Sequence, residues 1–383
     1  MVRALVLGFI SFFLLPAFAS AAPLTDTLEV SGWVPYWRFA TGTRDLLPHM
    51  SEITTVHPFG YIVQSDGTLY DPLESQAGLR AELKQAAATK KVRYIPTVMW
   101  QDGEAIHKIL SNAADRRALV ERIASLAEEN GFDGIDLDFE GKLAETKDYF
   151  SLFLRELYVR MGKKWVYCTI EPRTPISSRY LATPPRDAGM YANNYVAINK
   201  YCDRVQIMAY DQGSIDVRLN EMYDGPYTPI ADIAWVEKVM NLAAQTISKK
   251  KLVLGIPTYG YEYAVTPLTI EGYRYEVQWA FNYRYADEVA AEYRLTPQRS
   301  RGGEMFMTYF PSSTPMVSRA TAASQAAGPA AATTQPFNIL WWGDSISFAQ
   351  KVGIAKKLGL RGVAVFKFDG GQDPKIWDII GGR

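Results

Sequence analysis

The segment GFDGIDLDFE, residues 131–140, places carboxylates at alternating positions of what otherwise reads as a buried strand. Its acids and its large apolar residues are Asp133, Asp136, Asp138 and Glu140, with Ile135, Leu137 and Phe139 between them. Strand side chains alternate between two faces, so the apolar set and the last three acids point to opposite sides. Asp133 has the parity of the apolar set, and we expect it to fix the start of the strand rather than to contact a substrate.

The acidic face has three chemical interpretations on the residues alone. Crowded carboxylates in a low-dielectric interior cannot all ionise cheaply, so at least one pKa rises and a shared proton is expected. A glycosidase acid needs such a raised pKa. Three carboxylates could instead hold Mg²⁺ or Ca²⁺, or they could form a structural ion-pair cluster.

Eight short apolar runs, this segment included, recur along the chain and alternate with helical patterns. They cover residues 28–37, 53–63, 92–100, 131–140, 164–172, 202–211, 251–260 and 361–369. Apolar residues recur at helical spacing over 113–130 and 149–161, and Asp344 and Ser345 are candidate N-caps of a later helix. This order predicts an α/β protein, a (β/α)8 TIM barrel with its active site at the C-terminal ends of the strands.

One spacing departs from this rhythm, because about 100 residues separate the seventh run from the eighth. Residues 262–310 are rich in Tyr, Phe and Glu and alternate in places, which predicts a small α+β insertion between strands 7 and 8. Residues 312–336 are a low-complexity stretch of Ala, Thr and Ser, for which we expect a disordered loop.

The N-terminus has the form of a secretory signal. Arg3 precedes an apolar run over 4–15, and Ala19-Ser20-Ala21 fits the small-x-small cleavage pattern. The run is shorter than the roughly 20 residues that span a bilayer. We expect residues 1–22 to be a cleaved signal peptide and residues 23–383 to be secreted or to act in the periplasm or cell envelope, with no membrane attachment afterwards.

Composition and cysteine content narrow the partners. Lys+Arg and Asp+Glu balance at 41 each, which does not favour nucleic acid as a partner. Cys168 and Cys202 could pair in an exported protein, but Cys168 lies in the apolar run WVYCTI, where a buried free thiol fits as well. The Cys and His residues lack metal-site spacing, so we expect no metal and no cofactor, and we expect a monomer.

Four segments carry a family resemblance. DGIDLDFE (133–140) resembles the DxxDxDxE signature of glycoside hydrolase family 18, the chitinase family, with all four acids present. QIMAYDQ (206–212) resembles the MxYD segment of that family, and GIPTYGYEY (255–263) resembles its strand-seven segment. Residues 341–374 resemble the C-terminal barrel end of bacterial members, including the spore-cortex and cell-wall branch. The resemblance covers residues 28–383 and implies the same barrel and insertion.

The resemblance implies a role for each residue around these motifs. Glu140 would protonate the glycosidic oxygen and later activate water, while the N-acetyl carbonyl of the sugar attacks C1. Asp138 would hold the acetamide N–H, and Asp136 would share a proton with Asp138 and help tune Glu140. Tyr210 would donate its hydroxyl to the acetamide oxygen, and Asp211 would bind sugar or support the acetamide.

A set of large side chains would line the sugar cleft, although core packing explains each of them about equally well. They are Met208, Trp33, Trp37, Phe59 and Trp100. Phe366 stands where many chitinases have a Trp beneath the −1 sugar. A Phe can still stack but offers less area, which argues against tight binding there and against a preference for polymeric chitin.

The resulting functional hypothesis is an exported glycosidase that hydrolyses β-linkages at N-acetylglucosamine by substrate-assisted, retaining catalysis. Its substrate would be chitin, chitooligosaccharide or cell-wall glycan, with a slight preference for the last. The alternative is a weak or inactive carbohydrate-binding protein, similar to a chitolectin, on the same fold. Such relatives usually lack the catalytic Glu, whereas Glu140 is present here. A metal-dependent hydrolase is a third hypothesis, which the MxYD resemblance disfavours.

Overall fold

The computed structural model describes residues 28–268, 272–311 and 335–382. The expected signal peptide (1–22) and positions 312–334 of the expected low-complexity loop lie outside the described residues. No helix in the described part of the chain is both long and apolar enough to cross a membrane.

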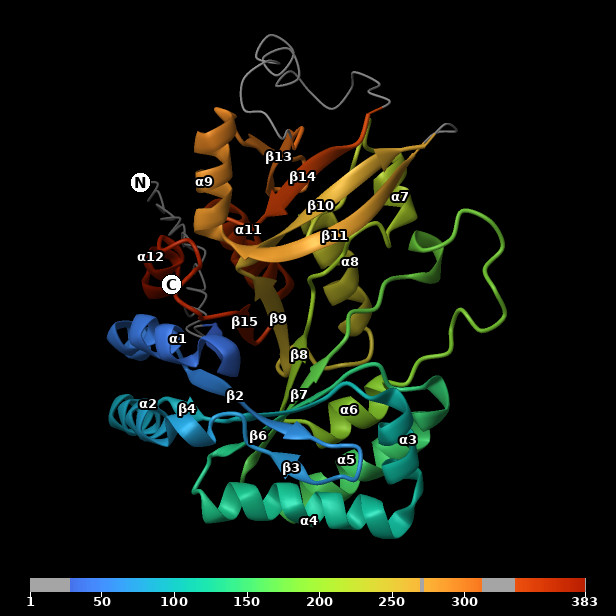
Figure 1. Cartoon of the computed structure of the whole chain (residues 1–383). Coiled ribbons are helices and arrows are strands. Elements are labelled where there is room, and N and C mark those ends of the chain that lie inside the picture. Colours follow the sequence, from blue (N-terminus) through green and yellow to red (C-terminus); the bar gives the residue numbers. More distant parts are fainter. Residues whose placement is uncertain (1–27, 269–271, 312–334, 383) are drawn as a thin grey trace, which may run out of the picture.

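Eight parallel strands close into a barrel, which confirms the predicted (β/α)8 fold (Figure 1). They are β1 (Glu29–Pro35), β2 (Thr55–Val63), β5 (Thr97–Trp100), β6 (Gly134–Phe139), β7 (Trp165–Ile170), β8 (Arg204–Ile207), β9 (Leu252–Pro257) and β15 (Gly362–Phe366). The ring closes because β1 pairs in parallel with both β2 and β15. Two short strands, β3 (Leu69–Tyr70) and β4 (Arg93–Tyr94), add to β2. Each predicted apolar run contains one barrel strand.

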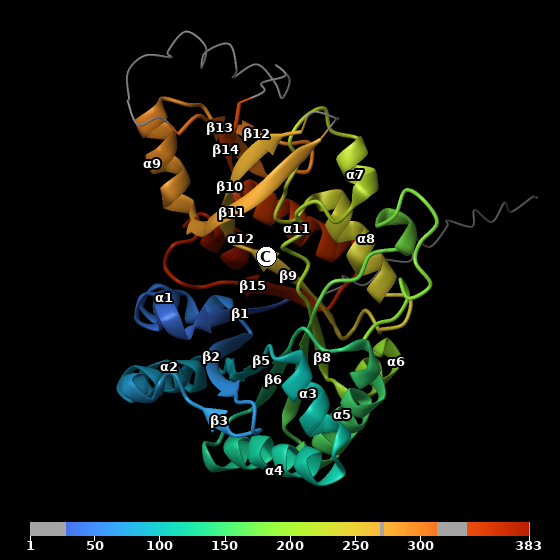
Figure 2. The ribbon, with the colours of Figure 1, turned by 45° about the vertical axis from the view of Figure 1, so that its right-hand side comes forward.

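Helices surround the barrel and cover the outer faces of its strands (Figure 2). They are α1 (Phe39–Leu46), α2 (Ala77–Lys90), α3 (Gly103–Ser111), α4 (Ala113–Glu129), α5 (Lys147–Met161), α6 (Tyr195–Tyr201), α8 (Ile233–Ala243), α11 (Ser345–Leu358) and α12 (Ile376–Gly381). A further short helix, α7 (Val217–Glu221), lies in the connection between β8 and α8. Short 3₁₀ turns are η1 (Tyr36–Arg38), η2 (Leu47–Glu52), η3 (Glu74–Gln76), η4 (Ala144–Thr146) and η5 (Ile176–Ser178). Asp344 is the N-cap of α11 and closes a capping box with Ser347.

The alternation in the acid-rich segment is the alternation of β6. Ile135, Leu137 and Phe139 are buried in the core between the barrel and the helices. The ring of Phe139 stacks on Phe153 of α5, with centroids 5.5 Å apart. The acids of opposite parity therefore point into the lumen, as the strand pattern predicts.

A second sheet stands at the side of the barrel where β9 ends (Figure 1). Its strand order is β11 (Tyr273–Asn282), β10 (Tyr259–Pro267), β14 (Phe337–Trp342), β13 (Met305–Tyr309) and β12 (Gln298–Arg299), with α9 (Tyr283–Tyr293) against it. The insertion therefore runs from 259 to 342 and exceeds the predicted 262–310. The difference arises because β10 follows β9 after a single residue, and because β14, beyond the low-complexity stretch, returns to the centre of the sheet.

A buried carboxylate fastens this sheet to the barrel. Glu304 accepts hydrogen bonds from the backbone N–H groups of Ile230 and Ala231 and from Nε1 of Trp341, at 2.8, 3.0 and 3.1 Å. Nζ of Lys351 on α11 lies 3.1 Å away and completes the set, and both side chains of this ion pair are buried. The insertion is thus held to the loop after β8 and to a barrel helix at one point.

The N-terminal end of the barrel strands, called the lower end below, is closed by one carboxylate among three arginines. Glu29 on β1 accepts from Arg204 at 2.6 and 2.7 Å and from Arg361 at 2.8 Å, and Arg93 lies 3.3 Å away. Despite the opposing effect of burial, these cations lower the pKa of Glu29 to about 2. The cluster joins β1 to strands that are distant in the sequence.

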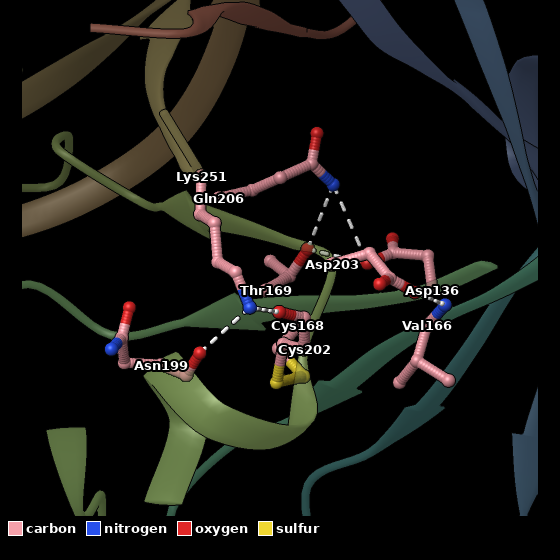
Figure 3. Close-up of a disulfide and its surroundings, with 9 residues drawn as sticks. All are labelled: Asp136, Val166, Cys168, Thr169, Asn199, Cys202, Asp203, Gln206 and Lys251. Atoms are coloured by element: carbon pink, nitrogen blue, oxygen red, sulfur yellow. Dashed lines mark hydrogen bonds between the residues drawn. A yellow bond between two sulfur atoms is a disulfide. The ribbon is translucent and has the colours of Figure 1, made fainter. Parts of the chain in front are cut away.

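The two cysteines form a disulfide that ties the end of α6 to β7 (Figure 3). Cys168 and Cys202 are both fully buried, and the bond between their sulfur atoms decides for the disulfide over the buried free thiol. The bridge lies on the outer, helix-covered face of β7, since the next residue, Thr169, points the other way, into the lumen toward Asp136.

Candidate active site

Asp136 is buried in the barrel lumen, and four donors from neighbouring strands surround its carboxylate. Oδ2 accepts from Trp33 Nε1 at 2.9 Å and from Thr97 Oγ1 at 2.7 Å. Oδ1 accepts from Thr169 Oγ1 at 2.7 Å and from Gln206 Nε2 at 3.4 Å, as Figure 3 shows for the Gln206 contact. Both carboxylate oxygens of Asp136 therefore act as hydrogen-bond acceptors, and the side chain is held in one orientation.

Asp138 lies two residues further along the same face and has the opposite environment. It is 3% exposed, and its Oδ1 is buried with no hydrogen-bond partner. Burial, and then the nearby charges of Glu140 and Asp136, raise the pKa of Asp138 well above its usual value. Asp138 therefore holds a proton more readily than an ordinary aspartate, and its Oδ1 has no hydrogen-bond partner within the protein.

Glu140 follows the last residue of β6 and stands at the rim of the barrel. Its Oε1 accepts from Gln101 Nε2 at 2.7 Å, and its backbone N–H donates to the Trp100 carbonyl at 2.8 Å. Partial burial raises the pKa of Glu140, and the charge of Glu171 raises it further, while the hydrogen bond from Gln101 acts against the shift. A carboxyl at the cleft with a raised pKa can act as a general acid.

Lys142 and Glu171 complete the rim beside Glu140, and the sequence analysis did not identify them. Lys142 Nζ donates to the carbonyl of Phe139 and lies 3.4 Å from Glu171 Oε2. Glu171 also accepts from the N–H of Gly141 at 2.9 Å. The sequence signal for Glu171 was its position directly after the apolar run WVYCTI, where parallel strands present functional groups. A buried lysine carries no comparable signal, because lysines are mostly exposed.

The segment after β8 brings Tyr210 and Asp211 to the rim two strands away from β6. The ring of Tyr210 stacks on Phe366 at 5.4 Å, and burial followed by the charge of Asp138 raises its pKa well above the usual value. Asp211 has a left-handed backbone, with φ of 57°. Tyr259 donates its hydroxyl to Asp211, and burial raises the pKa of Asp211.

A cavity of about 250 Å³ opens between the barrel mouth and the insertion. Its lining is Trp37, Asp211, Tyr259, Tyr261, Ala280, Phe281, Asn282, Phe366 and Lys367. Aromatic rings with a few polar groups are typical of a sugar-binding site. Tyr259 and Tyr261 were not identified from the sequence, since a single chain gave no means of telling cleft tyrosines from core tyrosines.

The other residues expected to line the cleft lie at different depths. Trp37 is 49% exposed and contacts the edge of Phe59, which is itself buried. Trp33 is buried below them, where it serves Asp136 as a donor. Trp100 does not line the cleft, because its ring packs against Phe139 in the core between the barrel and the helices. The short strand β5 ends at Trp100 with the outward parity, which explains the difference.

Two further predicted residues have backbone or packing contacts. Met208 is buried in the main hydrophobic core at the end of β8, and its N–H donates to the Ile170 carbonyl at 3.0 Å. Asp133 Oδ2 accepts from the N–H of Tyr94 at 2.7 Å, just before β6 begins. Within the described ranges, no group of three or more His, Cys, Asp or Glu side chains is arranged to hold a metal ion.

Taken as chemistry, the site offers a proton at the rim and polar groups below it. Glu140 can give a proton to an oxygen bound at the rim, while Asp138 and Tyr210 present polar atoms deeper in the lumen; none of the three is in the lining of the cavity described above. Asp136, held by its four donors, lies beneath them. This is the arrangement needed to break a bond whose leaving oxygen must be protonated while positive charge develops nearby.

Comparison with known proteins identifies the family of the chain. The sequence model of the Glycosyl hydrolases family 18 matches residues 32–371. An uncharacterized glycosylase of Bacillus subtilis (strain 168), YvbX, is 26% identical over 164 residues, which are 43% of this chain and 44% of that protein. The matches to the first three curated relatives span 44%, 60% and 46% of those proteins.

Solved structures share the fold at low identity. The spore cortex-lytic enzyme SleL of Bacillus cereus has a TM-score of 0.68 and 20% identity, over 92% of this chain and 73% of that one. A class V chitinase from Pseudomonas fluorescens Pf-5 has a TM-score of 0.69 and 20% identity, over 93% of this chain and 100% of that one. At these identities the likeness concerns the fold.

Proposed function

Because this chain belongs to the glycosyl hydrolases of family 18, we propose that it cleaves β-linkages next to N-acetylglucosamine by substrate-assisted, retaining hydrolysis. The observation that carries this proposal is the difference between three acids of one strand face. Asp136 has four donors, Asp138 has a buried bare oxygen, and Glu140 stands at the rim with a raised pKa. The same face thus supplies a fully hydrogen-bonded carboxylate, a carboxyl with an unused oxygen and a candidate acid.

In the first step Glu140 protonates the glycosidic oxygen as the bond to C1 breaks. The carbonyl oxygen of the N-acetyl group on the same sugar attacks C1, and an oxazolinium ion forms. Glu140, now ionised, removes a proton from the water that opens this ion, so that the product keeps the β configuration.

Asp138 and Tyr210 would act on the acetamide during both steps. Asp138 would accept a hydrogen bond from the acetamide N–H, for which its bare Oδ1 is suited. Tyr210 would donate its hydroxyl to the acetamide oxygen. Asp211 is occupied by Tyr259 and would support the wall of this pocket or bind a sugar hydroxyl.

A two-carboxylate mechanism is the chemical rival, with Glu171 as the nearest carboxylate on the neighbouring strand end. The contacts of Glu171 argue against a nucleophilic role. Gly141, Lys142 and Asn193 all donate to it. A carboxylate held by three donors is a poor nucleophile, so the acetamide of the substrate remains the better candidate.

For the substrate we favour a cell-wall or related N-acetylglucosamine glycan over polymeric chitin. Phe366 in the place of the larger tryptophan supports this preference, and so does the likeness to a spore cortex-lytic enzyme, although a chitinase is equally similar in fold. We further propose that the protein is exported. The N-terminal pattern and the buried disulfide support this, because disulfides persist in oxidising compartments.

The test is a product-mass assay on purified peptidoglycan and on chitooligosaccharides side by side, with Glu140→Gln as the control. We expect cleavage products that end in N-acetylglucosamine, at rates unaffected by EDTA. The variant should lose at least about 10²–10⁴-fold in turnover while it still binds sugar. Binding without hydrolysis by the wild type would favour a lectin, and activity that needs added metal would favour a metal-dependent hydrolase.

A further inference from the structure

We infer that Lys142 and Glu171 form a charge pair which fixes the turn after Glu140 and sets the upper pH limit of its action as an acid. The inference rests on the proposed function and names two positioning residues for it. Neither residue is expected to touch the reacting atoms.

Lys142 is an unusual residue to find below a catalytic rim. Its side chain is fully buried, and Nζ lies 5.0 Å from the ring centre of Phe150. The ammonium donates to the carbonyl of Phe139, the last residue of β6. Burial lowers the pKa of Lys142, and the carboxylates of Glu171, Asp138 and Glu140 act in the opposite direction and favour its charged form. The two acceptors at Nζ, the Phe139 carbonyl and Glu171 Oε2, suit the ammonium form of the side chain.

Glu171 ties the same turn from the neighbouring strand. It follows the last residue of β7, accepts from Gly141 at 2.9 Å and from Asn193 Nδ2 at 2.7 Å, and pairs with Lys142. Gly141 has φ of 63°, a conformation that suits glycine. Both residues that follow Glu140 are therefore bonded to one carboxylate, and the backbone of Glu140 is bonded to Trp100 on the other side.

The charges around Glu140 come from three strand ends. β6 and its turn contribute Asp136, Asp138 and Lys142, the end of β7 contributes Glu171, and the segment after β8 contributes Tyr210 and Asp211. Lys142 favours the ionised form of Glu140, whereas Glu171 and Asp211 disfavour it. The two members of the pair thus act on Glu140 with opposite signs.

The opposite effects of Lys142 and Glu171 distinguish an electrostatic role of the pair from a purely structural one. In the free enzyme, kcat/KM falls as the pH rises through the pKa at which the Asp138–Glu140 pair loses the proton needed for catalysis. Removing the cation should raise that pKa and extend activity to higher pH. Removing the anion should lower it and end activity at lower pH. Loss of a structural support would reduce the rate without opposite shifts of this limb.

The experiment is the pH profile of kcat/KM on a soluble chitooligosaccharide for the wild type and four variants. We expect Lys142→Met to move the alkaline limb upward and Glu171→Gln to move it downward, each by about one pH unit. The double variant should fall between them. Lys147→Met makes the same substitution at an exposed residue of α5 and should leave the limb unchanged.

Limbs that stay in place, or that move in the same direction for both single variants, would overturn the inference. If Lys142→Met fails to fold, as judged by its melting temperature, Glu171→Gln and a Lys142→Arg variant still decide the question, since Arg keeps the charge and should keep the limb. An active wild type with unmoved limbs refutes the pair alone. An inactive wild type, or an unimpaired Glu140→Gln, refutes the proposed function instead.

Discussion

Asp138 and Tyr210 reach the floor of the site from different strands, yet both are assigned to the same acetamide group. Each contact should strengthen as charge develops on the acetamide in the transition state. Asp138 has no competing partner at Oδ1, and Tyr210 is held in place by the ring of Phe366. The two side chains can therefore be tested as a unit.

We predict that Asp138→Asn and Tyr210→Phe each lower kcat more than they raise KM. Loss of one preorganised transition-state hydrogen bond costs about 2.7–4 kcal/mol in comparable sites. The double variant should lose less than the sum of the two, because both residues act on one group. Steady-state kinetics on a chitooligosaccharide measure kcat and KM for the three variants. Strictly additive losses would show that the two residues do not act on one shared group.

At the level of single residues, strand parity and a long motif mark the acids of the segment 133–140 as candidates, and a second motif marks Tyr210 and Asp211, whose roles stay predictions. The sequence did not predict what surrounds them. The donors to Asp136 come from positions 33, 97, 169 and 206, and only the register between distant strands brings them together. Trp33 was predicted to line the cleft with its aromatic face, whereas in the structure its indole N–H donates to Asp136.

Among the secondary-structure elements, the barrel strands were predictable and the insertion borders were not. Short apolar runs bounded by helical patterns identify strands well. β10 carries the same kind of run as β9 and follows it after one residue, so periodicity alone cannot separate a barrel strand from its neighbour in another sheet. Antiparallel pairing of β10 with β11 and β14 reveals the border.

The contact between α11 and the insertion gives a prediction at this scale. Lys351→Met leaves the buried carboxylate of Glu304 with three neutral donors and no cation. Breaking a buried ion pair from one side costs about 3–5 kcal/mol, so urea denaturation should show a loss of that order. Adding Glu304→Gln to Lys351→Met should restore part of the lost stability, because no unpaired charge then stays buried. A double variant that is less stable than Lys351→Met would contradict the role of this ion pair.

For the whole molecule, closure of the ring depends on contacts between the first strand and the last. Glu29 supplies one such contact at the lower end, where Arg204 and Arg361 converge on it. Its lowered pKa of about 2, against an ordinary value of 4.5, means that the folded state prefers the ionised carboxylate. This stabilisation is present above pH 4.5 and is lost as the pH falls toward 2.

We therefore predict that Glu29→Gln destabilises the protein by about 2–3 kcal/mol at neutral pH, after allowance for solvent screening. The difference from the wild type should shrink between pH 4.5 and 2, because the wild-type carboxyl becomes protonated there. Denaturant unfolding at pH 7, 4 and 2.5 measures it. A difference that stays constant over this range would show that the charge of Glu29 is not the cause.

The insertion sheet has a consequence for how such an enzyme can be altered. Residues 259–342 supply Tyr259, Tyr261 and Phe281 to the cavity wall, whereas the acids proposed to act in the reaction lie on β6 and directly after it. One continuous stretch of gene thus encodes much of the wall, and another encodes the chemistry. Recombination, natural or engineered, could exchange the wall as a cassette, provided that the partners of Glu304 travel with it.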